Sequence, residues 1–150
     1  MSAQDYFTRI AEVLSRIHST QKEKIQRAGA ALAHSISSGG RAYLFGSGHS
    51  VLPVLDIFPR YGSFVGFYPI YDPRLMWFNV VGPGGARELL WLERQEGYAR
   101  VLLASYVLEP RDSFVVFSHG GFGFISGELS EGPGHALERQ KASRRQRHLH

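Results

Sequence analysis

The chain has 150 residues, of which 43% are hydrophobic and 20% charged, and this composition fits one folded domain rather than a disordered chain. It contains no cysteine, which excludes disulfide bonds, thiolate nucleophiles and cysteine-ligated zinc. No apolar run approaches the roughly 20 residues of a membrane span, and the N-terminus lacks the basic start and apolar stretch of a signal peptide. We therefore expect a cytoplasmic protein with no membrane partner.

The net charge of +4 is concentrated at one end of the chain. Residues 1–130 hold 12 basic and 11 acidic residues, whereas residues 131–150 hold five basic and two acidic ones. The basic character therefore belongs to the last twenty residues and not to a face of the fold. Nucleic acid is an unlikely partner, because recognition requires basic residues spread over a structured surface.

Residues 3–37 are predicted to be helical, because apolar residues recur at spacings of three and four from Ile10 to Ile36. Thr20 and Glu23 have the spacing of a capping box, which predicts two helices that meet near residues 18–20. Two serines and two glycines at 37–40 then end the helical region. We expect residues 1–38 to form an N-terminal helical extension.

The middle of the chain alternates strand and helix signals. Short apolar runs predict strands at 41–46, 63–68 and 113–117, and helices are predicted at 51–61 and 87–106 with a loop at 69–86. This β–α–β–α–β order predicts an α/β fold with a parallel sheet covered by helices. Only three strands are found, whereas a doubly wound domain usually has five or six.

The last thirty residues have no clear period, and we expect residues 122–150 to form an irregular basic tail. The chain therefore looks short at its C-terminal end. One hypothesis is that the residues from about 122 on are a divergent or frame-shifted replacement for the rest of the domain. Sequencing of the genomic locus tests it, because an uninterrupted reading frame with homologous chains that end alike would refute it.

The first motif with chemical meaning is Gly46-Ser-Gly-His-Ser50, directly after a predicted strand and before a helix. Backbone N–H groups at such a junction form an anion site, and two serine hydroxyls add donors suited to phosphate. The dinucleotide fingerprint is excluded, because Val51 stands where its third glycine would fall, and no P-loop lysine follows. A tight turn without any ligand is the alternative.

A second motif, Ser118-His-Gly-Gly121, follows the last predicted strand. Two polar, glycine-containing loops at the carboxyl ends of adjacent parallel strands form the usual ligand crevice of an open α/β sheet. The alternative is that the glycines only end the strand.

Three segments resemble the sugar isomerase (SIS) phosphosugar-binding domain family, namely 40–50, 92–99 and 108–118. The segment 88–118 is also similar to part of the N-acetylmuramic acid 6-phosphate etherases. The resemblance covers about residues 5–121 and is closest to uncharacterised single-domain bacterial proteins. It implies a three-layer, flavodoxin-like fold with a parallel sheet, present here as an incomplete SIS domain over 39–121. It also implies a homodimer held through the N-terminal helices. The expected ligand is a phosphorylated sugar, with neither cofactor nor metal.

The resemblance also implies roles for particular residues. Phosphosugar binding falls to the two loops, with the residues Gly46, Ser47, Gly48, His49, Ser50, Ser118, His119 and Gly120. Glu96 matches the glutamate of the etherase Glu-Gly-Ala segment and is a candidate acid/base, since isomerisation or elimination removes a proton. The alternative for Glu96 is a solvated helix charge paired with Arg100. His49 is a candidate proton relay, and a hydrogen-bonding task alone is its alternative.

The second loop departs from the family pattern. His119 and Gly120 stand where relatives carry Asn-Ser, so one hydroxyl is missing, which would weaken phosphate binding by about 1.5–3 kcal/mol.

The resemblance leaves three hypotheses for the function of the chain. One is an isomerase or lyase of a sugar phosphate. A non-catalytic phosphosugar sensor and an inactive fragment that only dimerises are the others.

Overall fold

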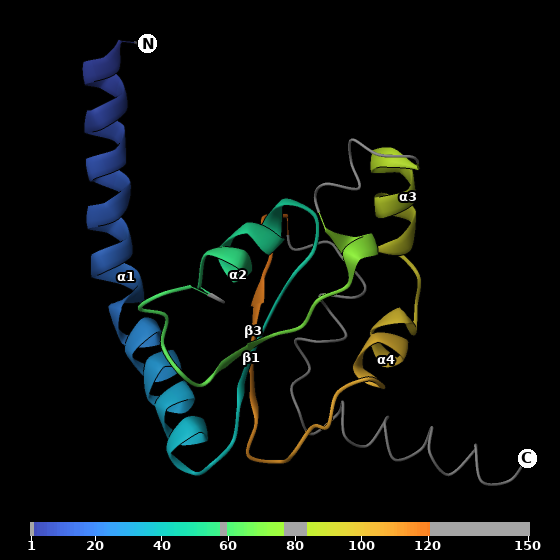
Figure 1. Ribbon diagram of the computed structural model, residues 1–150. Helices are drawn as coiled ribbons and strands as arrows, with labels where there is room; N and C mark the ends of the chain where they lie inside the picture. Colours follow the sequence, from blue (N-terminus) through green and yellow to red (C-terminus); the bar gives the residue numbers. More distant parts are fainter. Residues whose placement is uncertain (1, 58–59, 77–83, 121–150) are drawn as a thin grey trace, which may run out of the picture. The chain divides into compact units, whose positions relative to one another are not determined.

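The computed structural model of the protein describes residues 2–57, 60–76 and 84–120 (Figure 1). Within these residues the chain divides into two compact units, one ending at His34 and the other beginning at Ser35. The predicted basic tail at 122–150 lies outside the described residues, as do residues 77–83 of the predicted loop at 69–86.

The N-terminal region is one helix, α1, which runs from Ala3 to Ser37 without a break. The prediction of two helices meeting near residues 18–20 is therefore wrong. The Thr20 hydroxyl donates a hydrogen bond of 2.7 Å to the Arg16 carbonyl, four residues back in the same helix. A threonine that bonds the preceding turn continues a helix, and it no longer offers its oxygen as a cap.

Large apolar side chains lie exposed along the first two-thirds of α1. Leu14 is 60% exposed and Ile10 is 41% exposed. The exposed set is Tyr6, Phe7, Ile10, Val13, Leu14, Ile17 and Ile25. Most of these residues are three or four positions apart and so share a face of the helix.

The second unit is built on a parallel sheet of three strands in the order β2-β1-β3 (Figure 1). Strand β1 runs from Ala42 to Gly46, β2 from Phe67 to Pro69 and β3 from Ser113 to Phe117. The predicted α/β fold with a parallel sheet is confirmed. β3 has the predicted bounds and β1 starts one residue later than predicted, whereas β2 begins four residues later than the predicted strand.

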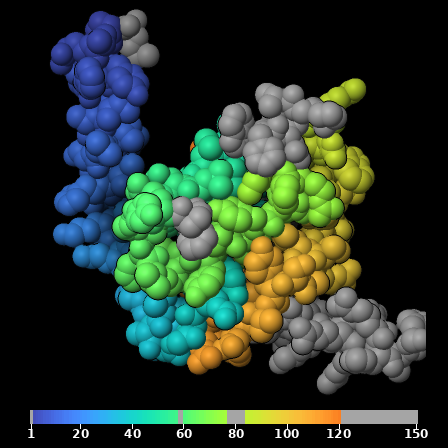
Figure 2. Space-filling view, viewed as in Figure 1, coloured from blue at the N-terminus to red at the C-terminus, as the bar shows by residue number. Residues whose placement is uncertain are grey.

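Both faces of the sheet are covered, which makes three layers. Tyr43 and Phe45 of β1 point into a core formed with the helices α3 (Gly85–Leu92) and α4 (Tyr98–Leu103), whereas Leu44 points into a second core with Val51 and Val54. All five residues of β1 are buried, as expected for a central parallel strand. In Figure 2 the side chains of α2 (Leu52–Ile57) and of the segment after it, in green, form part of the visible surface of this unit.

The helix after the first loop is short. A 3₁₀ turn at His49–Val51 leads into α2, which spans Leu52–Ile57 and has Pro53 in its first turn. A 3₁₀ turn at Pro73–Leu75 lies within the segment predicted to be a loop.

The single helix predicted at 87–106 is two helices, so this prediction is wrong. α3 spans Gly85–Leu92 and α4 spans Tyr98–Leu103. Gly97 lies between them with φ of 80°, in the left-handed region that glycine adopts without strain. The change of direction lets Leu89 and Leu92 of α3, and Leu102 and Leu103 of α4, all reach the same core.

Two buried aspartates fix the connections. Asp112 accepts hydrogen bonds from the backbone N–H groups of Arg41, at 2.8 Å, and Glu109, at 2.7 Å, and so ties the turn before β3 to the start of β1. Asp72 accepts hydrogen bonds from the Arg74 side chain and from the Tyr98 hydroxyl. Burial of the Asp72 carboxylate opposes its ionisation, but the hydrogen bonds from Arg74 and Tyr98 together hold its pKa below the ordinary value.

Of the helices in the described residues, none combines the length and the apolar character that a bilayer crossing requires.

Candidate functional site

The candidate site begins where β1 and β3 end. Gly46, the last residue of β1, is paired with Phe117, the last residue of β3. Because the strands are adjacent and parallel, the next residues, Ser47 and Ser118, leave the same edge of the sheet side by side. Register alone therefore brings the two polar loops of the sequence together.

The first loop is folded tightly against itself. A Cβ atom added to Gly46 would lie 1.9 Å from the Ser50 carbonyl oxygen, so only glycine fits there. The N–H of Gly48 donates to the Leu75 carbonyl at 2.7 Å, and that of Ser50 donates to the Ser47 carbonyl at 3.0 Å. Both amides already donate to backbone carbonyls of the protein, which leaves more of any ligand contact to the side chains than the sequence suggests.

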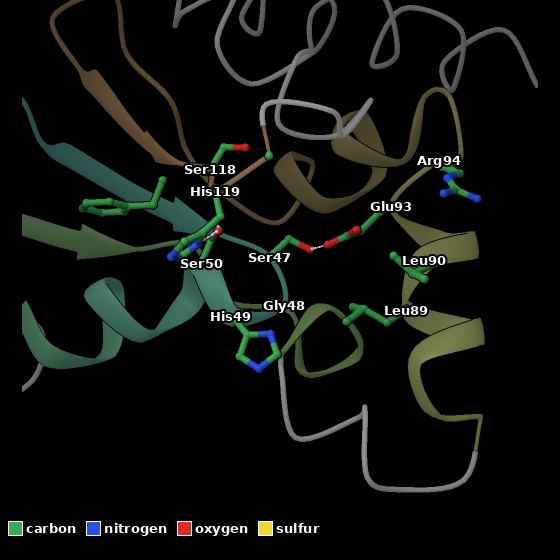
Figure 3. A pocket seen from close by; sticks show the side chains of 12 residues that line it. Ser47, Gly48, His49, Ser50, Leu89, Leu90, Glu93, Arg94, Ser118 and His119 are labelled. Atoms are coloured by element: carbon green, nitrogen blue, oxygen red, sulfur yellow. Dashed lines mark hydrogen bonds between the residues drawn. The ribbon is translucent and has the colours of Figure 1, made fainter. Parts of the chain in front are cut away.

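A pocket of about 340 Å³ lies between the two loops and α3 (Figure 3). This volume is within the range of small-molecule sites. Eight of its lining residues come from the two loops and the end of β3, and four come from α3 and the residue pair after it. They are Ser47, Gly48, His49, Ser50, Phe117, Ser118, His119 and Gly120, with Leu89, Leu90, Glu93 and Arg94.

Every loop residue predicted from the sequence for ligand binding, apart from Gly46, lines this pocket. Gly46 lies directly beneath the loop, in the fully buried strand. The structure therefore brings the two predicted motifs to one place. The prediction that they bind a ligand remains a prediction.

Ser50 and His119 join the two loops by a double contact. The buried Ser50 Oγ lies 2.7 Å from His119 Nδ1 and accepts a hydrogen bond of 3.2 Å from the His119 backbone N–H. Nδ1 either accepts the hydroxyl proton or, when the ring carries a proton there, donates to the oxygen. His119, which replaces a polar residue of the family pattern, is thus bound to the serine of the first loop.

On the other side of the pocket the Ser47 hydroxyl donates a short hydrogen bond to Glu93 Oε1 (Figure 3). Glu93 lies at the C-terminal end of α3, directly after its last residue. Neither Glu93 nor its neighbour Arg94 was predicted from the sequence. The signal that could have found them is the spacing of Leu89, Leu90, Glu93 and Arg94, which puts all four on one helix face.

The two residues predicted for proton transfer differ in their placement. His49 is exposed and lines the pocket. Glu96 is exposed in the turn between α3 and α4 and is not among the lining residues. Glu96 lies in a turn before α4, so the alternative of an i,i+4 pair with Arg100 within one helix does not apply.

The chemistry available in the pocket is that of hydroxyls, two imidazoles, one carboxylate and one guanidinium at the rim. Such groups bind oxyanions and sugar hydroxyls and can transfer protons. Among the described residues, no three histidine, aspartate or glutamate side chains gather as metal ligands would.

Comparisons with known proteins extend the sequence resemblance. A family model described as the SIS domain matches residues 5–123. The chain is 34% identical over 117 residues to a UPF0309 protein of Oceanobacillus iheyensis, which covers 78% of this chain and 46% of the relative. A UPF0309 protein of Halalkalibacterium halodurans is 34% identical over 116 residues, or 77% of this chain and 44% of the relative. The chain spans less than half the length of these relatives.

Proposed function

Because the chain belongs to the SIS domain family, we propose that the pocket between its two loops binds a phosphorylated sugar. The predicted resemblance to this family is confirmed by the match over residues 5–123. The observation that carries the proposal is that Ser50 and Ser118 line one pocket although they lie in loops that follow separate strands. Hydroxyls from two loops at one sheet edge are suited to a phosphate dianion.

The phosphate is assigned to the side of the pocket where Ser50, Ser118 and His119 lie. Ser50 supplies a hydroxyl that is already positioned by His119. The imidazole adds an N–H donor, and a positive charge when it is protonated, so it supports an anion in place of the missing hydroxyl. The sugar would then extend along the pocket towards α3.

A thermal-shift titration tests the proposal. The probes are glucose 6-phosphate, fructose 6-phosphate, glucosamine 6-phosphate and inorganic phosphate. Binding raises the unfolding temperature, and we expect Ser50→Ala to weaken it about 10- to 150-fold, the value of one hydrogen bond to a charged group. Ser105→Ala, at an exposed serine outside the pocket, is the matched control and keeps full affinity. Absence of any shift with all four probes refutes the proposal.

Turnover of the sugar phosphate is the second candidate, as an isomerase or a lyase. It is favoured by His49, an ionisable side chain that lines the pocket, and it retains the sequence-based assignment of Glu96 as acid/base. The compounds that bind are assayed for conversion with the native chain and Glu96→Gln. Turnover that disappears in Glu96→Gln supports the enzyme, whereas binding without turnover in either chain supports a sensor.

We further propose that α1 pairs with its counterpart in a second copy of the chain. Seven large apolar side chains are exposed on α1, and most of them share one helix face. A continuous apolar stripe of this kind is typical of a helix–helix interface and is unfavourable in water. A homodimer removes it from solvent.

A further inference from the structure

Glu93 is a carboxylate that lines a pocket proposed to bind an anion, and phosphate binding gives no reason for its presence. Its Oε1 accepts a hydrogen bond from the Ser47 hydroxyl, and the side chain is half-buried against the first loop. Among the described residues, no lysine, arginine or histidine lies within ion-pair distance of this carboxylate. A carboxylate held by one hydroxyl and paired with no cation repels an anionic ligand.

The other charged or titratable groups that line the pocket do not neutralise Glu93. Arg94 is exposed and lies on the far side of Glu93 from Ser47 (Figure 3). His119 is bound to Ser50 across the pocket, and His49 lies in the first loop, at the start of the 3₁₀ turn. The pocket thus has a donor side formed by Ser50, Ser118 and His119, and an acceptor side formed by Glu93.

A ligand that matches both sides carries a phosphate and a positive charge. We propose that Glu93 selects sugar phosphates that bear a free ammonium group over those with a hydroxyl or an acetamido group in its place. This inference rests on the proposed function, because it assumes that the donor side holds the phosphate. The ammonium group donates to Glu93 Oε2 while Ser47 donates to Oε1, and the ligand supplies a cation where the described residues place none.

Ser47 acts in this arrangement as a positioning residue. The sequence resemblance assigns it to phosphate, but its hydroxyl proton is directed at Glu93. The hydrogen bond between Ser47 and Glu93 depends on the close approach of the first loop to α3. A Cβ atom at Gly48 would lie 3.4 Å from Leu89 Cδ2 and 3.7 Å from Glu93 Oε1. The first loop and the Glu93 carboxylate therefore contact each other and form one wall of the pocket.

The test is calorimetric titration at pH 7 with glucosamine 6-phosphate, glucose 6-phosphate, N-acetylglucosamine 6-phosphate and inorganic phosphate. The native chain is expected to bind glucosamine 6-phosphate at least tenfold more tightly than the two uncharged sugars. Glu93→Gln removes this preference, weakens glucosamine 6-phosphate and strengthens inorganic phosphate, because the repulsion is gone. Glu88→Gln, on the same helix but outside the pocket lining, is the matched control and retains the preference.

The possible results of the titrations separate failure of the ammonium preference from failure of phosphosugar binding. Equal affinity of the native chain for charged and uncharged sugars overturns the inference while phosphosugar binding stands, and so does a preference that persists in Glu93→Gln. If no probe binds, the proposed function fails and this inference fails with it. The comparison of the ligands on the native chain needs no variant, so it remains decisive even where Glu93→Gln does not fold.

Discussion

Replacement of Gly46 by alanine tests the link between the backbone of the first loop and the site. The added Cβ atom would lie 1.9 Å from the Ser50 carbonyl oxygen, whereas contacts below 3.0 Å are essentially never seen. The Ser50 carbonyl therefore has to move by more than an ångström. The atoms that the Cβ meets belong to the backbone of Ser50 and Val51, which are buried, so no flexible side chain can absorb the shift.

We expect two effects of Gly46→Ala. Overpacking of this kind lowers the free energy of unfolding by about 1–3 kcal/mol. The displaced Ser50 also loses its contact with His119, now 2.7 Å, so binding of a phosphosugar weakens by about tenfold or more. Urea unfolding measures the first effect, and calorimetric titration with glucose 6-phosphate measures the second.

Gly29→Ala is the matched control for Gly46→Ala. A Cβ atom at Gly29 meets nothing within 4 Å, and this glycine is inside α1, so alanine raises stability by about 0.5–1 kcal/mol. A Gly46→Ala protein with native stability and native affinity would refute the packing argument, because it would mean that the loop relaxes freely.

Two further predictions concern Tyr98 and α1. Burial, together with the Asp72 carboxylate that accepts its hydrogen bond, raises the pKa of Tyr98 from 10.0 to about 12. Unfolded chains then lose this proton first, so stability conferred by the protonated hydroxyl falls as pH rises from about 10 towards 12. Absorbance titration should show a tyrosine that ionises near pH 12 and is missing in Tyr98→Phe; its presence in that variant contradicts the assignment. Leu14→Asp should convert the dimer to a monomer in light scattering, whereas Ser15→Asp, on a neighbouring face, should not; a native chain that is already monomeric contradicts the proposed helix pairing.

The sequence was informative where local signals and tertiary packing agree. β1 and β3 are short apolar runs bounded by glycines or by a turn, and they have nearly the predicted bounds. Adjacent parallel strands then imply that their following loops meet, so seven of the eight predicted loop residues line one pocket. The family resemblance rests on these same segments.

The failures have physical causes that periodicity does not reveal. The hydroxyl of Thr20 bonds back to Arg16, so a capping pattern lies inside a continuous helix. Gly97 takes a left-handed conformation that splits an otherwise regular apolar pattern. Glu93 was missed because its position in the pocket depends on where α3 ends and on how the helix lies against the first loop. The spacing of residues places Glu93 on the same helix face as Leu89, but it does not fix the end of α3 or the contact of the helix with the loop.

The contact between Ser50 and His119 joins positions 69 residues apart in the chain. No short fragment of the protein can therefore contain the pocket, because the pocket forms only after β3 has docked beside β1. Closing so long a segment is slow compared with forming local helices. A small molecule that occupies the pocket consequently stabilises the pairing of β1 with β3. Hydrogen exchange at the amides of both strands should therefore slow together when it binds.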